Sequence, residues 1–83
     1  GESLAEADAR ISDAWQRLLH EHTGGRILIA THATPIQLVL CASLGLDSAE
    51  RWRWRIDLGS LTCLDVYPSG AIVRMVNAVP KLK

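Results

Sequence analysis

The chain has 83 residues, with nine basic and nine acidic side chains and a formal net charge of zero. This balance argues against a nucleic acid or an anionic membrane as a partner that is held by bulk electrostatics. The sequence has no apolar run of about 18 residues and no basic segment followed by an apolar core, so we expect neither a membrane span nor a signal peptide.

The two cysteines also limit the class of protein. Cys41 lies in a helical apolar pattern and Cys63 in a strand-like one. We predict two buried free thiols rather than a disulfide, which indicates a reducing, cytoplasmic environment. No Cys-x-x-Cys motif or Cys/His spacing of a structural zinc site is present, so no metal is predicted.

Residues 4–23 are predicted to form an amphipathic helix. Ser3 is a suitable N-cap, and Glu6 follows at the spacing of a capping box. Apolar side chains repeat at helical spacing, at Leu4, Ala7, Ile11, Ala14, Trp15, Leu18 and Leu19.

The end of this helix carries two histidines and two glycines. Gly24 and Gly25 provide a common C-terminal stop. His20 and His22 lie in the last turn, where positive charge complements the helix dipole, and their spacing points them to different sides. We interpret both as solvated surface residues, with metal ligation as the alternative.

A strand is predicted over residues 26–31. Residues 27–30 are all apolar and include β-branched side chains, which is typical of a strand that is buried on both faces. Such a strand needs neighbours on both sides, yet only two other segments of the sequence resemble strands. We infer that a partner, or another part of the same protein, covers the rest.

A second helix is predicted over residues 35–44. Pro35 suits its first turn, Gly45 ends it, and it is apolar nearly all round, which predicts burial against a sheet. His32 therefore lies where a strand leads into a helix N-terminus. Ligands bind at the carboxyl ends of strands in α/β sheets, and helix N-termini favour anions. His32 is a candidate for contact with a phosphate or carboxylate, and a satisfied polar loop residue is the alternative.

A short third helix is predicted over residues 49–54, capped by Asp47 or Ser48. Arginine and tryptophan alternate in this region, at Arg51, Trp52, Arg53, Trp54 and Arg55. Such alternation could stack on nucleic acid bases. Because the net charge is zero, we favour packed tryptophans with solvated or ion-paired arginines.

Two strands are predicted near the end of the chain, over residues 61–67 and 71–76. The turn signal Pro-Ser-Gly at residues 68–70 joins them as an antiparallel hairpin, and residues 77–83 form a tail. A strand–helix–strand unit crosses over right-handed and gives parallel strands. The predicted fold class is therefore α/β, with a mostly parallel sheet and an antiparallel edge strand.

Four segments of the chain follow one another in the order of the segments of a known family: residues 1–3, 27–36, 52–64 and 71–77. Together they resemble the C-terminal half of a histidine phosphatase of the phosphoglycerate-mutase-like superfamily. They are similar to its Gly-Gly-Glu-Ser helix start, its apolar strand with Ser-His-Gly-Gly-Pro-Ile, its Asn/Asp-x-Gly/Ala-Ser segment and its final edge strand. The likeness is strongest to alpha-ribazole-phosphatase-type acid phosphatases, as in the phosphatase domain fused to ribonuclease H in some actinobacterial proteins.

This resemblance implies that residues 1–83 are the C-terminal segment of one domain, a three-layer α/β/α sandwich. The family hydrolyses phosphomonoesters, or transfers phosphate, through a phosphohistidine. The nucleophilic histidine belongs to an Arg-His-Gly motif near the N-terminus of the domain, and this sequence contains no such motif.

The resemblance assigns His32 to the family's second histidine, which holds the phosphoryl group and is catalytic. Thr31 replaces the usual serine, and Ala33 and Thr34 replace the usual glycines. The backbone N–H of Ala33 still reaches an oxyanion in such a variant, so Ala33 is predicted to bind phosphate. The replacements leave the substrate preference open.

Physical chemistry agrees with this role for His32. Phosphoryl transfer needs positive charge and N–H donors on the phosphoryl oxygens, and a protonated histidine at a helix start supplies both. A charge-assisted hydrogen bond of this kind contributes roughly 1.5–3 kcal/mol. Neither a metal nor a cofactor is expected, because histidine and arginine carry the charge. Thr31, Asp57 and Ser60 are predicted as residues that support the site from beside it. Asp57 and Ser60 would either orient His32 and its loop or serve in turn and capping interactions.

The predicted function is therefore that of the C-terminal segment of a cytoplasmic histidine acid phosphatase. Its partners would be a small phosphomonoester and the missing N-terminal segment, and the isolated 83-residue chain would be inactive. The alternative is a catalytically inactive half-domain that binds another protein, or dimerises, through its open sheet edge. No membrane contact is expected, and nucleic acid contact only through a fused domain.

Overall fold

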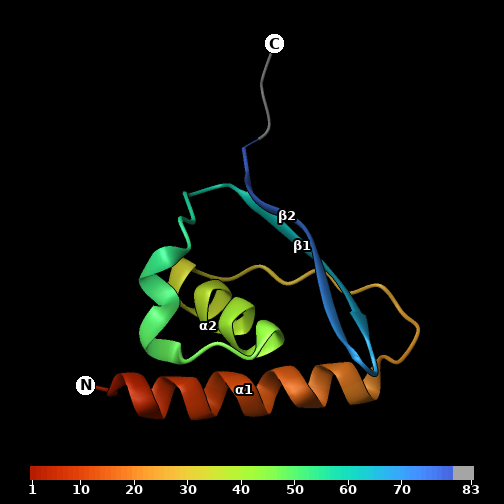
Figure 1. The fold of residues 1–83 in the computed structure, drawn as a ribbon, viewed down its shortest axis with the longest axis horizontal. Coiled ribbons are helices and arrows are strands. Elements are labelled where there is room, and N and C mark those ends of the chain that lie inside the picture. Colours follow the sequence, from red (N-terminus) through yellow and green to blue (C-terminus); the bar gives the residue numbers. More distant parts are fainter. Residues whose placement is uncertain (80–83) are drawn as a thin grey trace.

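The computed structural model describes residues 1–79, which form three helical segments and one hairpin (Figure 1). In chain order the elements are α1 (Leu4–Glu21), α2 (Ala33–Leu44), the 3-10 helix η1 (Ser48–Arg53), β1 (Leu61–Tyr67) and β2 (Gly70–Ala78). These helices and strands are consistent with the α/β class. Among residues 1–79 the sheet contains only the antiparallel pair β1–β2, so the predicted parallel sheet and three-layer sandwich are not formed by these residues.

Helix α1 has the predicted capping box. The Ser3 hydroxyl accepts from the Glu6 backbone N–H at 3.1 Å, and the Glu6 carboxylate accepts from the Ser3 N–H at 3.2 Å. The helix ends at Glu21, before the predicted residue 23, because the Thr23 hydroxyl donates to the backbone carbonyls of the last turn and Gly24 is left-handed. The two histidines of this end are exposed, as predicted.

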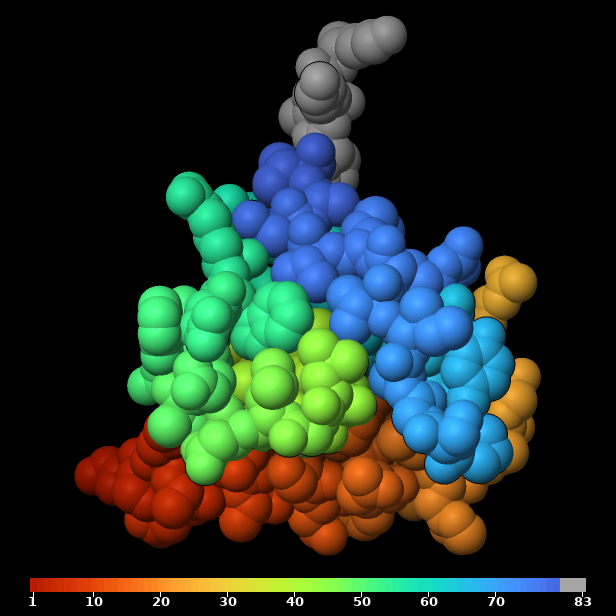
Figure 2. Space-filling view, in the orientation of Figure 1, coloured from red at the N-terminus to blue at the C-terminus, as the bar shows by residue number. Residues whose placement is uncertain are grey.

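Helix α2 contains the fully buried residues of the described chain, Leu38, Leu40 and Cys41. It contacts α1, η1 and β2, and in the space-filling view its atoms lie between α1 and the hairpin (Figure 2). The Gln37 side chain donates to the Trp54 carbonyl at 2.8 Å, which ties α2 to the end of η1. Burial of α2 is thus confirmed, although it packs mainly on helices and on one strand rather than on a parallel sheet.

The predicted strand at residues 26–31 is wrong for the described residues. This segment runs as an extended chain without ladder hydrogen bonds from the end of α1 to the start of α2 (Figure 1). Ile27, Leu28 and Ile29 are 40, 89 and 47% exposed. The physical reason is that a strand exists only through its neighbours, and residues 1–79 supply none beside this segment.

The predicted hairpin is confirmed. Strands β1 and β2 pair antiparallel from Tyr67–Gly70 to Leu61–Ala78, with irregular register around Cys63. Strand β2 continues through Asn77 and Ala78, which were predicted to begin a tail. The rest of that predicted tail, at residues 80–83, lies outside the described residues.

The third helix forms as a 3-10 turn over Ser48–Arg53, with the Asp47 carboxylate accepting from the Ala49 N–H at 2.9 Å. Arg53 interacts with neighbours in the same turn. Its guanidinium forms an ion pair with Glu50 at 3.5 Å and lies 5.6 Å from the ring centroid of Trp52. These contacts favour ion-paired arginines over stacking on nucleic acid. The predicted packing of the tryptophans is wrong for Trp52, which is 69% exposed, whereas Trp54 is half-buried. None of the helices within residues 1–79 has the length and apolar character needed to cross a membrane.

Candidate functional site

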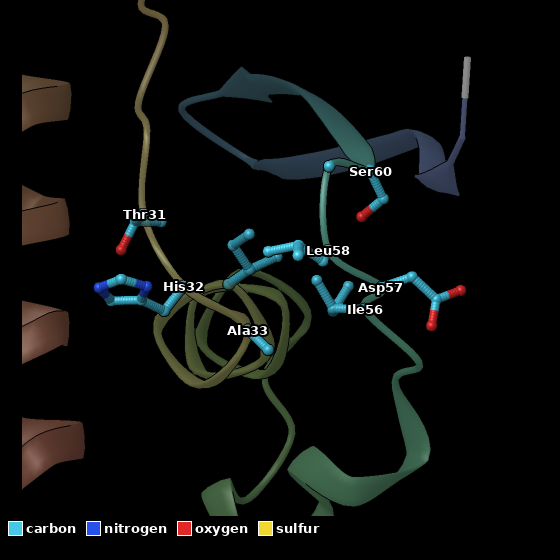
Figure 3. A pocket seen from close by; sticks show the side chains of 9 residues that line it. Thr31, His32, Ala33, Ile56, Asp57, Leu58 and Ser60 are labelled. Atoms are coloured by element: carbon cyan, nitrogen blue, oxygen red, sulfur yellow. The ribbon is translucent and has the colours of Figure 1, made fainter. Parts of the chain in front are cut away.

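The start of α2 and the loop before β1 form a pocket of about 230 Å³ (Figure 3). We call residues 56–60 the pocket loop. The two sides bring together nearly all the residues singled out from the sequence, and the lining is Thr31, His32, Ala33, Ile36, Ile56, Asp57, Leu58, Gly59 and Ser60. A larger hollow of about 490 Å³ beside η1 is lined by Leu46, Glu50, Arg53 and Trp54 and holds no histidine.

His32 is the N-cap residue of α2. Its backbone is extended, with φ −111° and ψ 173°, and its carbonyl accepts the first helical hydrogen bond from Ile36 at 3.4 Å. Its side chain makes no capping hydrogen bond and is exposed. The imidazole is therefore not tied to the helix, and in Figure 3 it points away from the pocket loop.

The first turn of α2 offers further donors beside His32. Backbone N–H groups at the start of a helix have no carbonyl partner within the helix. Ala33 and Thr34 provide two such groups, whereas Pro35 has none. Together with the positive end of the helix dipole, these groups make this side of the pocket suited to an anion.

Asp57 does not contact His32. Its carboxylate accepts from Asn77 Nδ2 at 3.0 Å and from Arg55 Nε at 3.2 and 3.3 Å. In Figure 3 the carboxylate and the imidazole lie on opposite sides of the pocket and point apart. The hydrogen bond from Asn77 lowers the pKa of Asp57, burial opposes this, and Arg55 lowers the pKa further. The geometry therefore places Asp57 in support of the pocket loop rather than of the imidazole.

Ser60 and Thr31 also line the pocket. The Ser60 N–H donates to the Asp57 carbonyl at 3.2 Å, which closes the turn of the pocket loop. The Ser60 hydroxyl is buried and has no hydrogen-bond partner within residues 1–79, so it does not orient His32. Thr31 is exposed and precedes His32 on the extended segment.

Sequence reasoning missed Asn77, which was assigned to a tail. It lies in β2, has a left-handed φ of 56° and contacts Asp57 with both side-chain atoms. An asparagine inside an otherwise apolar strand pattern was the available signal, because asparagine is depleted in strands.

Comparison with known proteins identifies the family. A model of the histidine phosphatase superfamily (branch 1) matches residues 1–79. The chain belongs to this superfamily. It is 33% identical over 78 residues to a Mycobacterium tuberculosis protein described as bifunctional, covering 93% of this chain and 21% of that protein. It is 23% identical over 77 residues to phosphoserine phosphatase 1 of Hydrogenobacter thermophilus, covering 93% of this chain and 36% of that enzyme.

The chain thus spans about a fifth of the mycobacterial relative and about a third of the Hydrogenobacter one. Within residues 1–79 no cluster of three or more His, Cys, Asp or Glu residues is arranged to hold a metal ion.

Proposed function

We propose that this chain is the C-terminal segment of a histidine phosphatase domain that hydrolyses small phosphomonoesters, with His32 as the phosphate-binding histidine. The observation that carries the proposal is the placement of His32. His32 lines a pocket at the N-terminus of α2, its imidazole makes no capping hydrogen bond, and the first backbone N–H groups of this helix have no partner within the helix. Family membership supports the same role.

In this proposal the substrate phosphate sits against the start of α2. A protonated His32 donates to one phosphoryl oxygen, and the Ala33 N–H donates to another. As the ester bond to the leaving group breaks, negative charge spreads over these oxygens, and donors that are already in place stabilise it without reorganisation. The nucleophile is a histidine in an Arg-His-Gly segment that this chain lacks, and water then releases phosphate from the phosphohistidine.

The missing segment also accounts for the exposed apolar residues. Ile27, Leu28 and Ile29 form an extended run without strand partners among residues 1–79, and the relatives are several times longer than the matched region. We propose that strands of this segment pair with residues 26–31 and complete a three-layer sandwich around a mostly parallel sheet. We use the term complete domain for this chain together with that segment.

The finer assignment is also a proposal. The resemblance favours an enzyme of the alpha-ribazole-phosphatase type, which is a phosphatase rather than a mutase. The same type of domain is fused to ribonuclease H in some actinobacterial proteins. One relative is named a phosphoserine phosphatase and another bifunctional. A cytoplasmic location fits the two free cysteines, because disulfides are rare in reducing compartments.

The test is the substitution His32→Ala in the complete domain, with turnover of p-nitrophenyl phosphate as the readout. We expect kcat/KM to fall about 10²–10³-fold, the cost of removing one donor to a developing oxyanion. His20→Ala is the matched control, because His20 is an equally exposed histidine in the last turn of α1. Turnover that survives His32→Ala would remove His32 from the site.

A second candidate is a catalytically inactive interaction module. The exposed, unpaired segment at residues 26–31 favours it, because such a segment can pair with another chain or a second copy. Native mass spectrometry discriminates between the two. A species that carries Arg-His-Gly together with this chain supports the phosphatase, whereas a homodimer of the 83-residue chain supports the module.

A further inference from the structure

Asn77 joins the end of the hairpin to the pocket loop. Its Oδ1 accepts from the Asp57 backbone N–H at 2.7 Å, and its Nδ2 donates to Asp57 Oδ2 at 3.0 Å. Its own backbone N–H donates to Thr62 Oγ1 at 3.3 Å. One side chain on β2 therefore holds both the backbone and the carboxylate of a residue that lines the His32 pocket.

The pocket loop has few other attachments to the hairpin. Within the loop, the Ser60 N–H bonds to the Asp57 carbonyl, and Arg55 pairs with the Asp57 carboxylate from an exposed position. Both contacts are local in sequence. The Asn77 contacts bridge 20 residues, so they set where the loop lies relative to β2. Because β2 also contacts α2, the same strand links the pocket loop to the helix on the other side of the pocket.

Asparagine suits this position for two reasons. Its φ of 56° is left-handed, a region that asparagine enters more readily than most residues with a side chain. Its amide also carries a donor and an acceptor, which match the carboxylate and the N–H of Asp57. An aspartate would keep the shape but set two carboxylates against each other, and an alanine would remove both bonds.

We propose that Asn77 is a positioning residue that holds the pocket loop opposite His32 through its paired hydrogen bonds to Asp57. The role in catalysis rests on the proposed phosphatase function; the role in holding the loop does not. Asn77 reaches the substrate only through the loop, whose Leu58 and Gly59 face the pocket. Loss of the contacts lets the loop move, and the wall of the pocket moves with it.

The experiment uses the complete domain and four variants. Asn77→Ala removes both bonds, and Asn77→Asp opposes two carboxylates. The double variant Asp57→Asn with Asn77→Asp restores an amide–carboxylate pair. Arg74→Ala is the matched control, because it removes an exposed ion pair with Asp65 on the same two strands, away from the pocket. Circular dichroism first confirms that each variant is folded at the assay temperature.

Two readouts are then compared. Hydrogen exchange of residues 56–60 is expected to accelerate in both single variants and to return toward wild type in the double variant. For p-nitrophenyl phosphate, kcat/KM is expected to fall about tenfold to a hundredfold in the single variants, the range expected when a group is misplaced by about 1 Å. This loss should come more from a rise in KM than from a fall in kcat, because the chemical groups themselves remain.

Unchanged loop exchange in Asn77→Ala would overturn the proposal. Faster exchange with unchanged kinetics would overturn the positioning role and leave a structural one. An inactive wild-type domain would overturn the proposed function and the catalytic part of this inference, while the exchange data would still decide whether Asn77 holds the loop. An effect of Arg74→Ala equal to that of Asn77→Ala would assign the change to the hairpin as a whole.

Discussion

Two apolar segments of this chain differ in how far they are buried. In α2, Leu38 and Leu40 are 1% and 0% exposed, whereas Leu28 in the extended segment before it is 89% exposed. The difference lies in where each segment finds its hydrogen bonds. A helix satisfies its backbone internally and needs only a surface to pack on, but a strand depends on neighbouring strands.

The hairpin shows the same rule from the other side. Strands β1 and β2 pair because a short turn brings each its neighbour. In the complete domain proposed above, the neighbours of residues 26–31 would be strands that are distant in sequence. His32 lies between the two kinds of segment. Helix α2, whose backbone hydrogen bonds are internal, follows it, and residues 26–31, which have no strand partner among residues 1–79, precede it.

The largest expected effect contrasts the two apolar segments directly. We expect Leu40→Ala to destabilise the protein by about 2–5 kcal/mol, because it leaves a cavity in a packed core. Leu28→Ala should leave the urea midpoint of the 83-residue chain unchanged but should destabilise the complete domain. If Leu28→Ala destabilised the 83-residue chain and the complete domain equally, the contrast between the two segments would fail, because residues 26–31 would then gain no stability from added strands.

A smaller effect on stability is expected at the residue that ends α2. Gly45 ends the helix in the left-handed conformation, with φ 70°, and an added Cβ would meet no atom within 4 Å. Gly45→Ala should therefore lower the free energy of unfolding only through backbone strain in the left-handed conformation, by about 1–2 kcal/mol. Thermal unfolding measures it, and Gly1→Ala is the control, because Gly1 has no positive φ and an added Cβ there would also meet no atom within 4 Å. A negligible cost would mean that the end of α2 can rearrange.

The smallest expected effect concerns acid. Hydrogen bonding from Asn77, and then Arg55, lowers the pKa of folded Asp57 below its ordinary value of 3.8. The carboxylate therefore adds stability that is fully present above that value and is lost as the pH falls through the lower, folded pKa.

We expect wild-type protein to lose more stability than Asp57→Asn as the pH falls below about 4, measured by urea unfolding at a series of pH values. Glu2, whose pKa Arg10 lowers, contributes in the same direction, so Glu2→Gln is the parallel control. Identical acid profiles for wild type and Asp57→Asn would contradict the Asn77–Asp57 contact.

Much of the local structure was predictable because its causes are local. The capping box of Ser3 and Glu6, the glycine after α2 and the turn before Gly70 each act over a few residues. The position of His32 at a helix start followed from the same signals. The partners of Asp57 did not, because Asn77 lies 20 residues away and a side-chain pair at that distance leaves no periodic trace.

The amino-acid sequence by itself determined the helices, the hairpin, the family likeness and the placement of His32 before α2, because these depend on periodicity, caps and motif order. Only the tertiary structure decided that residues 26–31 pair with no strand among residues 1–79, that Asp57 turns away from His32, and that Asn77 bonds to Asp57 of the pocket loop. The physical reason is common to all three. Strand pairing and side-chain hydrogen bonds between distant segments are decided by which groups the folded chain brings within about 3 Å.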